Sequence, residues 1–278
     1  MQPPADPSPS VVLDWPIDDV ACLTLARGAA FNTLTLEMVR ALDEAVEEAH
    51  RRGARVLIVT GQGRAFCAGA HIDYFTEPNT PLGSALAIRE DYVRPILRVF
   101  RKLHTKPFVS IAAINGFALG GGCELALSCD FRLIAADARI GLTEVRLGAI
   151  PAGGGLQLLA KIVGRARALE IVLLGDQLDA DAAVAAGLAT RACPPEALAA
   201  EALALAARLL KCGPTAVAEA KRAIYRCETA DGEEANEIAL DALAAVAGGS
   251  EWAEGMRAFM EKRPPGFMRR PAGGGGDR

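Results

Sequence analysis

Short apolar runs alternate with amphipathic segments over the first two-thirds of the chain. These runs have the length of buried strands and carry few charges; they are VACLTLA (20–26), RVLIVTG (55–61), FVSIAAING (108–116), FRLIAAD (131–137) and the shorter RIGL (139–142). Strands that alternate with helices pair in parallel, because a crossover helix returns the chain to the same end of the sheet. The pattern therefore predicts an α/β core.

The clearest amphipathic segment covers residues 36–50. Its apolar side chains recur at helical spacing, at Leu36, Val39, Leu42, Val46 and Ala49. Thr35 is placed to cap the first turn of this segment, and Gly53 is placed to end it. We therefore expect a helix between the first two strands.

The last third of the chain changes character. Between about residue 155 and residue 263 the segments are nearly all helical, and Gly and Pro residues separate them. The two ends are rich in Pro or Gly, as disordered tails often are. We expect four parts: a disordered N-terminal tail (1–15), an α/β core (16–200), a helical C-terminal region (201–268) and a disordered C-terminal tail (269–278).

Composition narrows the class of protein. With 278 residues, 51% of them hydrophobic, the chain can bury one large core, and its net charge of -4 argues against a nucleic-acid partner. The seven cysteines are odd in number and form no C-x-x-C pair, which favours reduced thiols in the cytoplasm. No apolar stretch is long enough for a membrane span, and the N-terminus does not resemble a secretory signal.

The segment ALGGGCELALSCD (118–130) links a strand to a helix through three glycines. Such a loop exposes main-chain N–H groups beside the positive end of a helix, a site that suits a phosphate or a developing oxyanion. Neither the G-x-G-x-x-G pattern nor the G-x-x-x-x-G-K-[ST] pattern is present, so the sequence favours an oxyanion over a nucleotide phosphate. A second loop, GQGRAFCAGAHID (61–73), has small residues around Gly69 and Ala70. One N–H group from each loop would make a two-donor oxyanion hole.

Two glutamates stand beside these glycines. Glu124 follows the first glycine run directly, and Glu144 lies twenty residues further on, ahead of the glycines at 153–155. A reaction that takes one proton and gives another needs two such carboxyl groups. A helix-start carboxylate at Glu124 and a surface glutamate at Glu144 are the plainer interpretations, and the glycines at 153–155 could form only a tight turn.

Several ordered motifs together resemble the enoyl-CoA hydratase/isomerase (crotonase) superfamily. They are RAFCAGAHID, INGFALGGGCELALSCD, IGLTEVRLGAIPAGGG, the later LLGDQLDADAAVAAGLATRACPPEAL and the terminal EGMRAFMEKRPPGF, and the resemblance covers roughly residues 18 to 268. It implies a crotonase-like spiral of ββα turns with a helical C-terminal trimerisation part, assembled as a trimer or a dimer of trimers. It also implies an acyl-CoA substrate, with no metal and no cofactor beyond the coenzyme A of that substrate.

The resemblance assigns roles by position. Ala70 and Gly121 would hold the thioester oxygen through their N–H groups. Glu144 would deliver a proton to the α-carbon, and Glu124 would help to activate water. The CoA-binding positions would be Arg27, Cys67, Ala68 and Ile72, with Phe259 and Lys262 reaching the CoA of a neighbouring subunit.

The sequence departs from the family pattern at a few places. Ala29 stands near a position where relatives carry a lysine that contacts the CoA phosphate, and Arg27 lies close by. His71 stands where relatives often have Asp, and we interpret it as a loop histidine rather than a base. Cys67 and Cys123 have no histidine paired with them in sequence, which argues against a catalytic thiol.

We expect an acyl-CoA lyase that hydrates a 2-enoyl-CoA to a 3-hydroxyacyl-CoA. An enoyl-CoA isomerase is the first alternative, although such enzymes often keep only one of the two glutamates. Decarboxylation, dehalogenation and thioester hydrolysis on the same scaffold stay open. A non-catalytic CoA- or RNA-binding scaffold is the alternative of another class. The acyl specificity is not readable, because the sequence does not say which of Tyr74, Phe75 and Tyr92 face inward.

Overall fold

Two β-sheets form the centre of the molecule. The computed structural model describes residues 9–76, 80 and 82–267. The larger sheet has the order β1-β2-β3-β5-β7-β10, and its strands span Val11–Ile17, Val20–Leu25, Val56–Gly61, Val109–Ile114, Phe131–Ala135 and Arg191–Cys193. The smaller sheet has the order β4-β6-β8-β9, with strands Ala65–Cys67, Phe117–Leu119, Arg139–Gly141 and Leu178–Asp179.

The chain builds both sheets at once by a repeated turn. β3 and β4, then β5 and β6, then β7 and β8 each put one strand into the larger sheet and the next into the smaller one, and helices follow. β2, β3, β5, β7 and β10 pair in parallel, whereas β1 joins the edge antiparallel to β2. The α/β class and the spiral of ββα turns expected from the sequence are confirmed.

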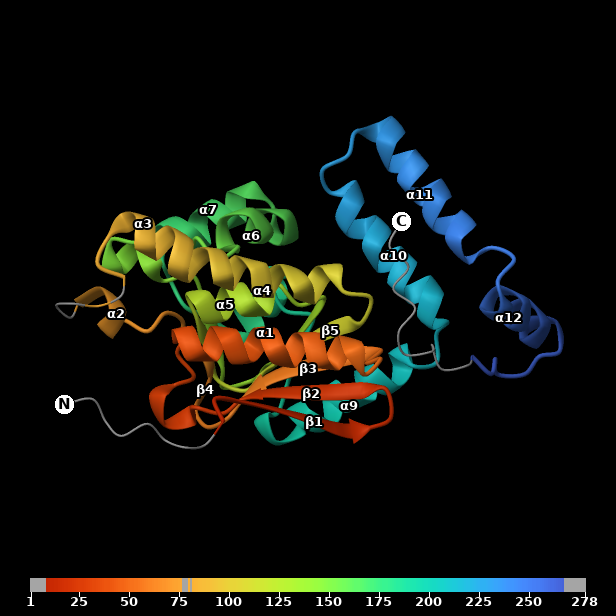
Figure 1. The fold of residues 1–278 in the computed structure, drawn as a ribbon, viewed down its shortest axis with the longest axis horizontal. Helices are drawn as coiled ribbons and strands as arrows, with labels where there is room; N and C mark the ends of the chain where they lie inside the picture. The colour runs from red at the N-terminus through yellow and green to blue at the C-terminus, as the bar shows by residue number, and fades with distance from the viewer. Residues whose placement is uncertain (1–8, 77–79, 81, 268–278) are drawn as a thin grey trace.

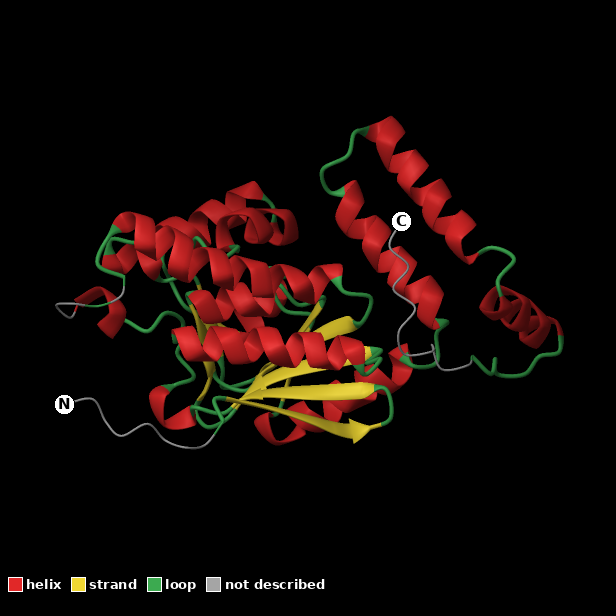
Figure 2. Cartoon of the chain, in the orientation of Figure 1, coloured by secondary structure: helices red, strands yellow, loops and turns green. Residues whose placement is uncertain are grey.

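Helices cover both faces of the larger sheet (Figures 1 and 2). α1 (Leu36–Arg51) and α4 (Arg94–Thr105) lie side by side on one face, and α9 (Leu198–Leu209) packs on the opposite face. The other helices are α2 (Asp73–Thr76), α3 (Ala85–Ala87), α5 (Gly121–Leu127), α6 (Gly155–Val163), α7 (Arg165–Leu174), α8 (Ala180–Ala185), α10 (Pro214–Cys227), α11 (Gly232–Val246) and α12 (Ser250–Met260).

The expected start of α1 is confirmed in detail. The Thr35 hydroxyl accepts a 3.1 Å hydrogen bond from the Met38 N–H, which satisfies one of the donors that every helix start leaves free. The apolar stripe of α1 is buried, and Gly53 takes a positive φ of 79° just after the helix. Local sequence and tertiary packing agree here.

Two expected boundaries are wrong. The N-terminal tail was expected to reach residue 15, but β1 begins at Val11, because Val11, Leu13 and Trp15 alternate with exposed residues and pack against the core. The boundary at residue 200 falls inside α9, a helix that belongs to the core because it packs on β3, β5 and β7. The expected C-terminal tail (269–278) lies outside the described residues.

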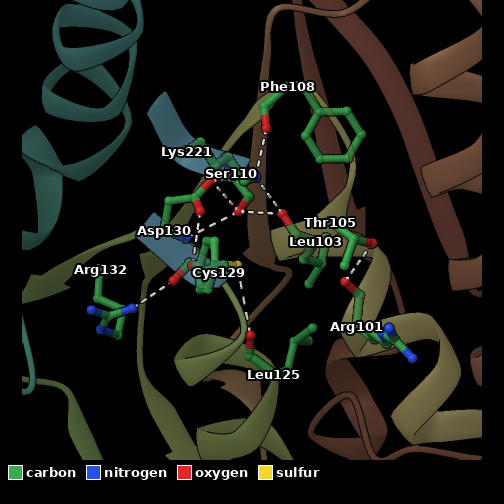
Figure 3. A network of polar contacts seen from close by, with 11 residues as sticks. Arg101, Leu103, Thr105, Phe108, Ser110, Leu125, Cys129, Asp130, Arg132 and Lys221 are labelled. Atoms are coloured by element: carbon green, nitrogen blue, oxygen red, sulfur yellow. Dashed lines mark hydrogen bonds and ion pairs between the residues drawn. The ribbon is translucent and has the colours of Figure 1, made fainter. Parts of the chain in front are cut away.

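Helices α10 to α12 extend away from the sheets as a separate helical arm (Figure 1). A buried ion pair attaches this arm to the core: the Lys221 Nζ of α10 lies 2.7 Å from Asp130 Oδ2 and also donates to the main-chain oxygens of Leu103 and Phe108. Figure 3 shows Lys221 beside Asp130 and Ser110, and Asp130 also accepts from the Ser110 N–H and hydroxyl. Every polar group of the pair is therefore satisfied by several partners, as a buried charge requires.

Within the part of the chain that the structure describes, none of the helices is both long enough and apolar enough to pass through a lipid bilayer.

Candidate active site

The glycine run of residues 120–122 allows the first turn of α5 to pack directly against neighbouring main chain. Gly120 takes a positive φ of 53°, and a side chain at Gly122 would overlap the main-chain oxygen of Cys67. Only glycine fits such a close approach of two main chains. The run therefore brings the start of α5 directly against the loop that follows β4.

The two predicted oxyanion loops meet at this point. A Cβ atom placed on Gly69 would lie only 3.2 Å from the main-chain nitrogen of Gly121. Gly121 is the first residue of α5, so its N–H group has no acceptor within the helix. Ala70 follows Gly69, whose main-chain oxygen accepts a 2.8 Å hydrogen bond from the Leu34 N–H. The structure thus brings Ala70 and Gly121 together on neighbouring loops.

Glu124 lies in the first turn of α5 and is almost completely buried, with 4% of its surface exposed. The Gly155 N–H donates a 2.8 Å hydrogen bond to Glu124 Oε1, and a Cβ atom on Gly153 would lie 2.5 Å from Oε2. Burial raises the pKa of Glu124 to about 7, against the opposing effect of the Gly155 hydrogen bond. A carboxyl group with this pKa can take or give a proton near neutral pH.

Glu144 is the first residue of a short 3-10 helix, η3 (Glu144–Leu147), which begins shortly after β8. Its carboxyl group lies over the first glycine loop, because a Cβ atom on Gly120 would be 3.2 Å from Glu144 Oε1. Among the described residues no group hydrogen-bonds its buried Oε2 atom. Burial raises the pKa of Glu144, since desolvation penalises the ionised form.

The two glutamates share one electrostatic environment. The charge of Glu144 contributes to the raised pKa of Glu124. Burial raises the pKa of the Cys123 thiol, which directly precedes Glu124, and both carboxylates add to that effect. Two carboxyl groups that repel each other hold on to a proton more tightly than either does alone. The pair can therefore retain one proton near neutral pH.

An aromatic and aliphatic group lies next to Glu124. Tyr92 is buried, its ring meets Phe75 edge-on at 5.6 Å, and its pKa is raised by burial with a small contribution from Glu124. Ile96 approaches the Gly153 loop that holds Glu124. The structure answers the question that the sequence left open for Tyr92, which faces inward, whereas Phe75 stays partly exposed.

Four of the expected CoA-binding residues lie near the second loop. Arg27 donates a 3.1 Å hydrogen bond to the Thr35 hydroxyl, and the Ala68 N–H donates a 3.0 Å bond to the Phe31 main-chain oxygen. Cys67 is completely buried, whereas Ile72 is exposed.

The structure does not bring the other two expected residues to this site. Phe259 lies in α12 at the far end of the helical arm, and Lys262 follows that helix. Phe259 is 81% exposed, which is a high value for a large apolar side chain. In one copy of the protein, both residues are remote from Glu124 and Glu144.

The cysteines and the histidine near the site have structural settings. The thiols of Cys67 and Cys123 are fully buried, and burial raises the pKa of Cys67 to about 12 and that of Cys123 well above its usual value. Such thiols stay protonated and unreactive. His71 Nδ1 lies 3.1 Å from the Thr33 hydroxyl and its Nε2 lies 3.6 Å from an Asp73 carboxylate oxygen. This matches a loop histidine held by polar neighbours.

Sequence reasoning missed the residues that hold the site from outside its motifs. Asn32 donates from its side-chain amide to the main-chain oxygens of Gln62, Ala65 and Phe66, and so fixes the loop that leads into β4. Gly155 supplies the hydrogen bond to Glu124. The glycines at 153–155 are the one signal of this contact in the sequence, and a tight turn would explain them equally well.

Comparisons with known proteins identify relatives that match almost the whole chain. A family model described as enoyl-CoA hydratase/isomerase matches residues 18–270. A crotonyl-CoA hydratase of Syntrophomonas wolfei is 36% identical over 253 residues, which cover 90% of this chain and 95% of that protein. A 2,3-dehydroadipyl-CoA hydratase of Escherichia coli is 35% identical, over 88% of this chain and 92% of that one.

Solved structures give the same result for the fold. The crystal structure of an enoyl-CoA hydratase from Bacillus anthracis superposes with a TM-score of 0.87 at 33% identity, over 94% of this chain and all of that one. The match extends through the helical arm as well as the spiral core. With its two glycine loops, its paired glutamates and its ββα spiral, the chain belongs to the enoyl-CoA hydratase/isomerase family.

Proposed function

We propose that this protein is an enoyl-CoA hydratase, a lyase that adds water across the double bond of a 2-enoyl-CoA to give a 3-hydroxyacyl-CoA. Relatives that carry hydratase names cover about nine-tenths of the chain. The observation that carries the proposal is the meeting of two electrostatically coupled carboxyl groups, Glu124 and Glu144, beside the glycine loops.

The proposed reaction balances its protons within the pair. The oxygen of a water molecule bonds to the β-carbon while the ionised Glu124 accepts one of its protons. The electrons of the double bond move toward the thioester, whose oxygen gains negative charge. The protonated Glu144 then gives its proton to the α-carbon, the carbonyl reforms, and the proton on Glu124 returns to Glu144 through solvent or directly.

The N–H groups of Ala70 and Gly121 are proposed to hold the thioester oxygen. The charge that develops in this reaction gathers on that one oxygen, and two amides aimed at it stabilise the transition state more than the ground state. Removing one donor of such a hole costs on the order of 100- to 1000-fold in rate. Because main-chain amides polarise the thioester, the proposed chemistry needs no metal and no redox cofactor.

Coenzyme A is proposed to bind along the second loop, at Arg27, at the main chain of Cys67 and Ala68, and at Ile72. Phe259 and Lys262 are too remote to contribute within one copy, so we propose that they serve a neighbouring subunit. Exposed apolar side chains on the arm support assembly into a trimer or a dimer of trimers; they include Ile224, Leu240, Leu243, Met256, Phe259 and Met260. Light scattering coupled to size-exclusion chromatography measures this state directly.

A cytoplasmic location is also part of the proposal. Its support is that none of the seven cysteines forms a disulfide, as is usual in a reducing compartment, and that several of these thiols are buried in the core.

The test of the proposed function is a substrate panel. Purified protein is incubated with 2-enoyl-CoAs of increasing chain length and with a 3-enoyl-CoA, and loss of the conjugated thioester absorbance is followed. Mass spectrometry then measures uptake of labelled oxygen from H₂¹⁸O. Hydration predicts labelled 3-hydroxyacyl-CoA from the 2-enoyl compounds.

The isomerase remains the second candidate, because the family includes both activities. Conversion of the 3-enoyl-CoA to a 2-enoyl-CoA, with no label taken up from water by any substrate, would promote it over the hydratase. Release of free CoA or of CO₂ would instead favour a hydrolase or a decarboxylase, and binding without turnover would favour a non-catalytic scaffold.

A further inference from the structure

Tyr92 occupies an unusual position in the chain, inside a single π-helical turn (Ile88–Val93) that leads into α4. Turns of this kind are rare and occur often at functional sites. The Tyr92 side chain is 3% exposed, yet its hydroxyl group is fully used. It donates a 2.6 Å hydrogen bond to the main-chain oxygen of Leu34 and accepts a 3.3 Å bond from the His71 N–H.

Both partners of this hydroxyl group belong to the second glycine loop or touch it. His71 directly follows Ala70, and Leu34 forms an isolated parallel bridge with Ala70. The Leu34 N–H also donates to the main-chain oxygen of Gly69, at 2.8 Å. Tyr92 and Leu34 therefore fix the main chain on either side of Ala70.

Leu34 contacts the first glycine loop as well. A Cβ atom on Gly121 would lie 2.9 Å from Leu34 Cδ1, so this side chain packs directly on the start of α5. One residue thus spaces the two loops whose amides are proposed to hold the thioester oxygen. An oxyanion hole depends on this spacing, since misplacement by about 1 Å can cost on the order of 100-fold in rate.

We propose that Tyr92 is a positioning residue for the oxyanion hole, which locks the Ala70 amide in place through Leu34 and His71. The inference rests on the proposed function, because it concerns the same thioester site. Tyr92 does not act as an acid or a base. Its hydroxyl proton is committed to the Leu34 oxygen, and both of its hydrogen bonds are to the main chain.

The aromatic neighbours of Tyr92 provide a matched control. Tyr74 lies in the same cluster, with its ring 6.0 Å from that of Tyr92, and its hydroxyl also accepts a main-chain hydrogen bond. That bond comes from the Leu36 N–H, at the start of α1, and not from the glycine loop. Tyr74→Phe therefore removes a comparable hydroxyl group but keeps the hydrogen bonds that hold the main chain around Ala70.

The experiment compares Tyr92→Phe and Tyr74→Phe with the unaltered protein in two measurements. The first is kcat and KM for crotonyl-CoA. The second is the absorption spectrum of a bound 4-(dimethylamino)cinnamoyl-CoA, a chromophore whose band moves to longer wavelength when its thioester carbonyl is polarised. The second measurement reports on the hole without any turnover. Circular dichroism and thermal unfolding restrict the comparison to folded protein.

We expect Tyr92→Phe to lower kcat at least about tenfold with little change in KM, and to reduce the spectral shift of the bound chromophore. Tyr74→Phe should change neither. Equal losses in the two variants, a rise in KM alone, or an unchanged spectrum in Tyr92→Phe would each overturn the inference. If the unaltered protein hydrates no enoyl-CoA, the proposed function is wrong. The spectral shift of the bound chromophore then still tests whether Tyr92 positions the oxyanion hole.

Discussion

The Gly155 N–H donates a 2.8 Å hydrogen bond to Glu124 Oε1 across 31 residues of sequence. This bond favours the ionised form of a carboxyl group that burial would otherwise keep protonated, and the balance leaves the pKa of Glu124 at about 7. The third glycine run therefore affects the ionisation of Glu124 as well as forming a turn. Together with burial, it places the pKa of Glu124 near neutral pH.

Gly153→Ala tests whether the position of the Glu124 carboxyl group matters, because Gly153 lies beside Oε2 whereas Gly155 bonds to Oε1. The added methyl group would lie 2.5 Å from Glu124 Oε2, so the carboxyl group must move. We expect kcat for crotonyl-CoA to fall on the order of 10- to 100-fold. Gly232→Ala is the control, because a Cβ atom there meets nothing within 4 Å. Full activity in Gly153→Ala would show that the position of Glu124 is not critical.

The raised pKa of Glu124 predicts a stability that depends on pH. Between pH 4.5, the usual pKa, and about pH 7, the folded protein binds a proton that the unfolded chain releases, so stability falls as the pH rises through this window. Above it, Glu124→Gln should be more stable than the unaltered protein by up to about 3 kcal/mol, since one pKa unit corresponds to about 1.4 kcal/mol.

Thermal unfolding at a series of pH values measures this difference. The two melting temperatures should converge as the pH falls below 4.5, where Glu124 becomes neutral in both the folded and the unfolded state. The stability gained by Glu124→Gln over the unaltered protein should be larger at pH 8 than at pH 5. A smaller gain at pH 8 would contradict a raised pKa.

The coupled glutamates predict a bell-shaped pH profile of kcat/KM. The reaction needs one proton on the pair, so the rate should rise as the pair loses its first proton and fall as it loses the second. Because burial raises the pKa of both Glu124 and Glu144, we expect one limb near pH 7. A profile that is flat from pH 5 to pH 9 would argue against acid–base catalysis by this pair.

We predict that Lys221→Met lowers the free energy of unfolding and changes the rate of crotonyl-CoA hydration very little. The variant leaves Asp130 buried without its cation, and breaking such a pair costs about 3–5 kcal/mol. The exposed pair of Arg146 and Asp176 is the control, since Asp176→Asn should cost at most about 1 kcal/mol. Urea unfolding of both variants gives the comparison. Equal, small losses would show that the ion pair does not attach the arm to the core.

The sequence predicted those features in which the local pattern and the tertiary structure favour the same residue types. The α1 segment reveals its cap at Thr35 and its apolar stripe, and the glycines around Glu124 show that the chain is crowded there. The strand β1 was missed because a proline within a run argues against a strand, although Pro16 and Asp14 both occupy exposed positions of this edge strand.

The supports of the site could not be predicted in the same way. Tyr92 bonds to Leu34 across 58 residues, and Lys221 bonds to Asp130 across 91. Neither pair has a local signature, because a tyrosine or a lysine in a helix is ordinary until the fold shows what its polar atom meets. Family resemblance identified the residues proposed to do the chemistry, whereas the structure was needed to identify those that hold them in place.

The most direct test of the account is the rate of crotonyl-CoA hydration by Glu124→Gln, Glu144→Gln and the double variant. General acid and base groups each contribute on the order of 100- to 10,000-fold, and groups that act as a unit are not additive. We predict losses of this size in each single variant and little further loss in the double variant. Hydration at the unaltered rate in either single variant would contradict the assignment of that glutamate to the reaction.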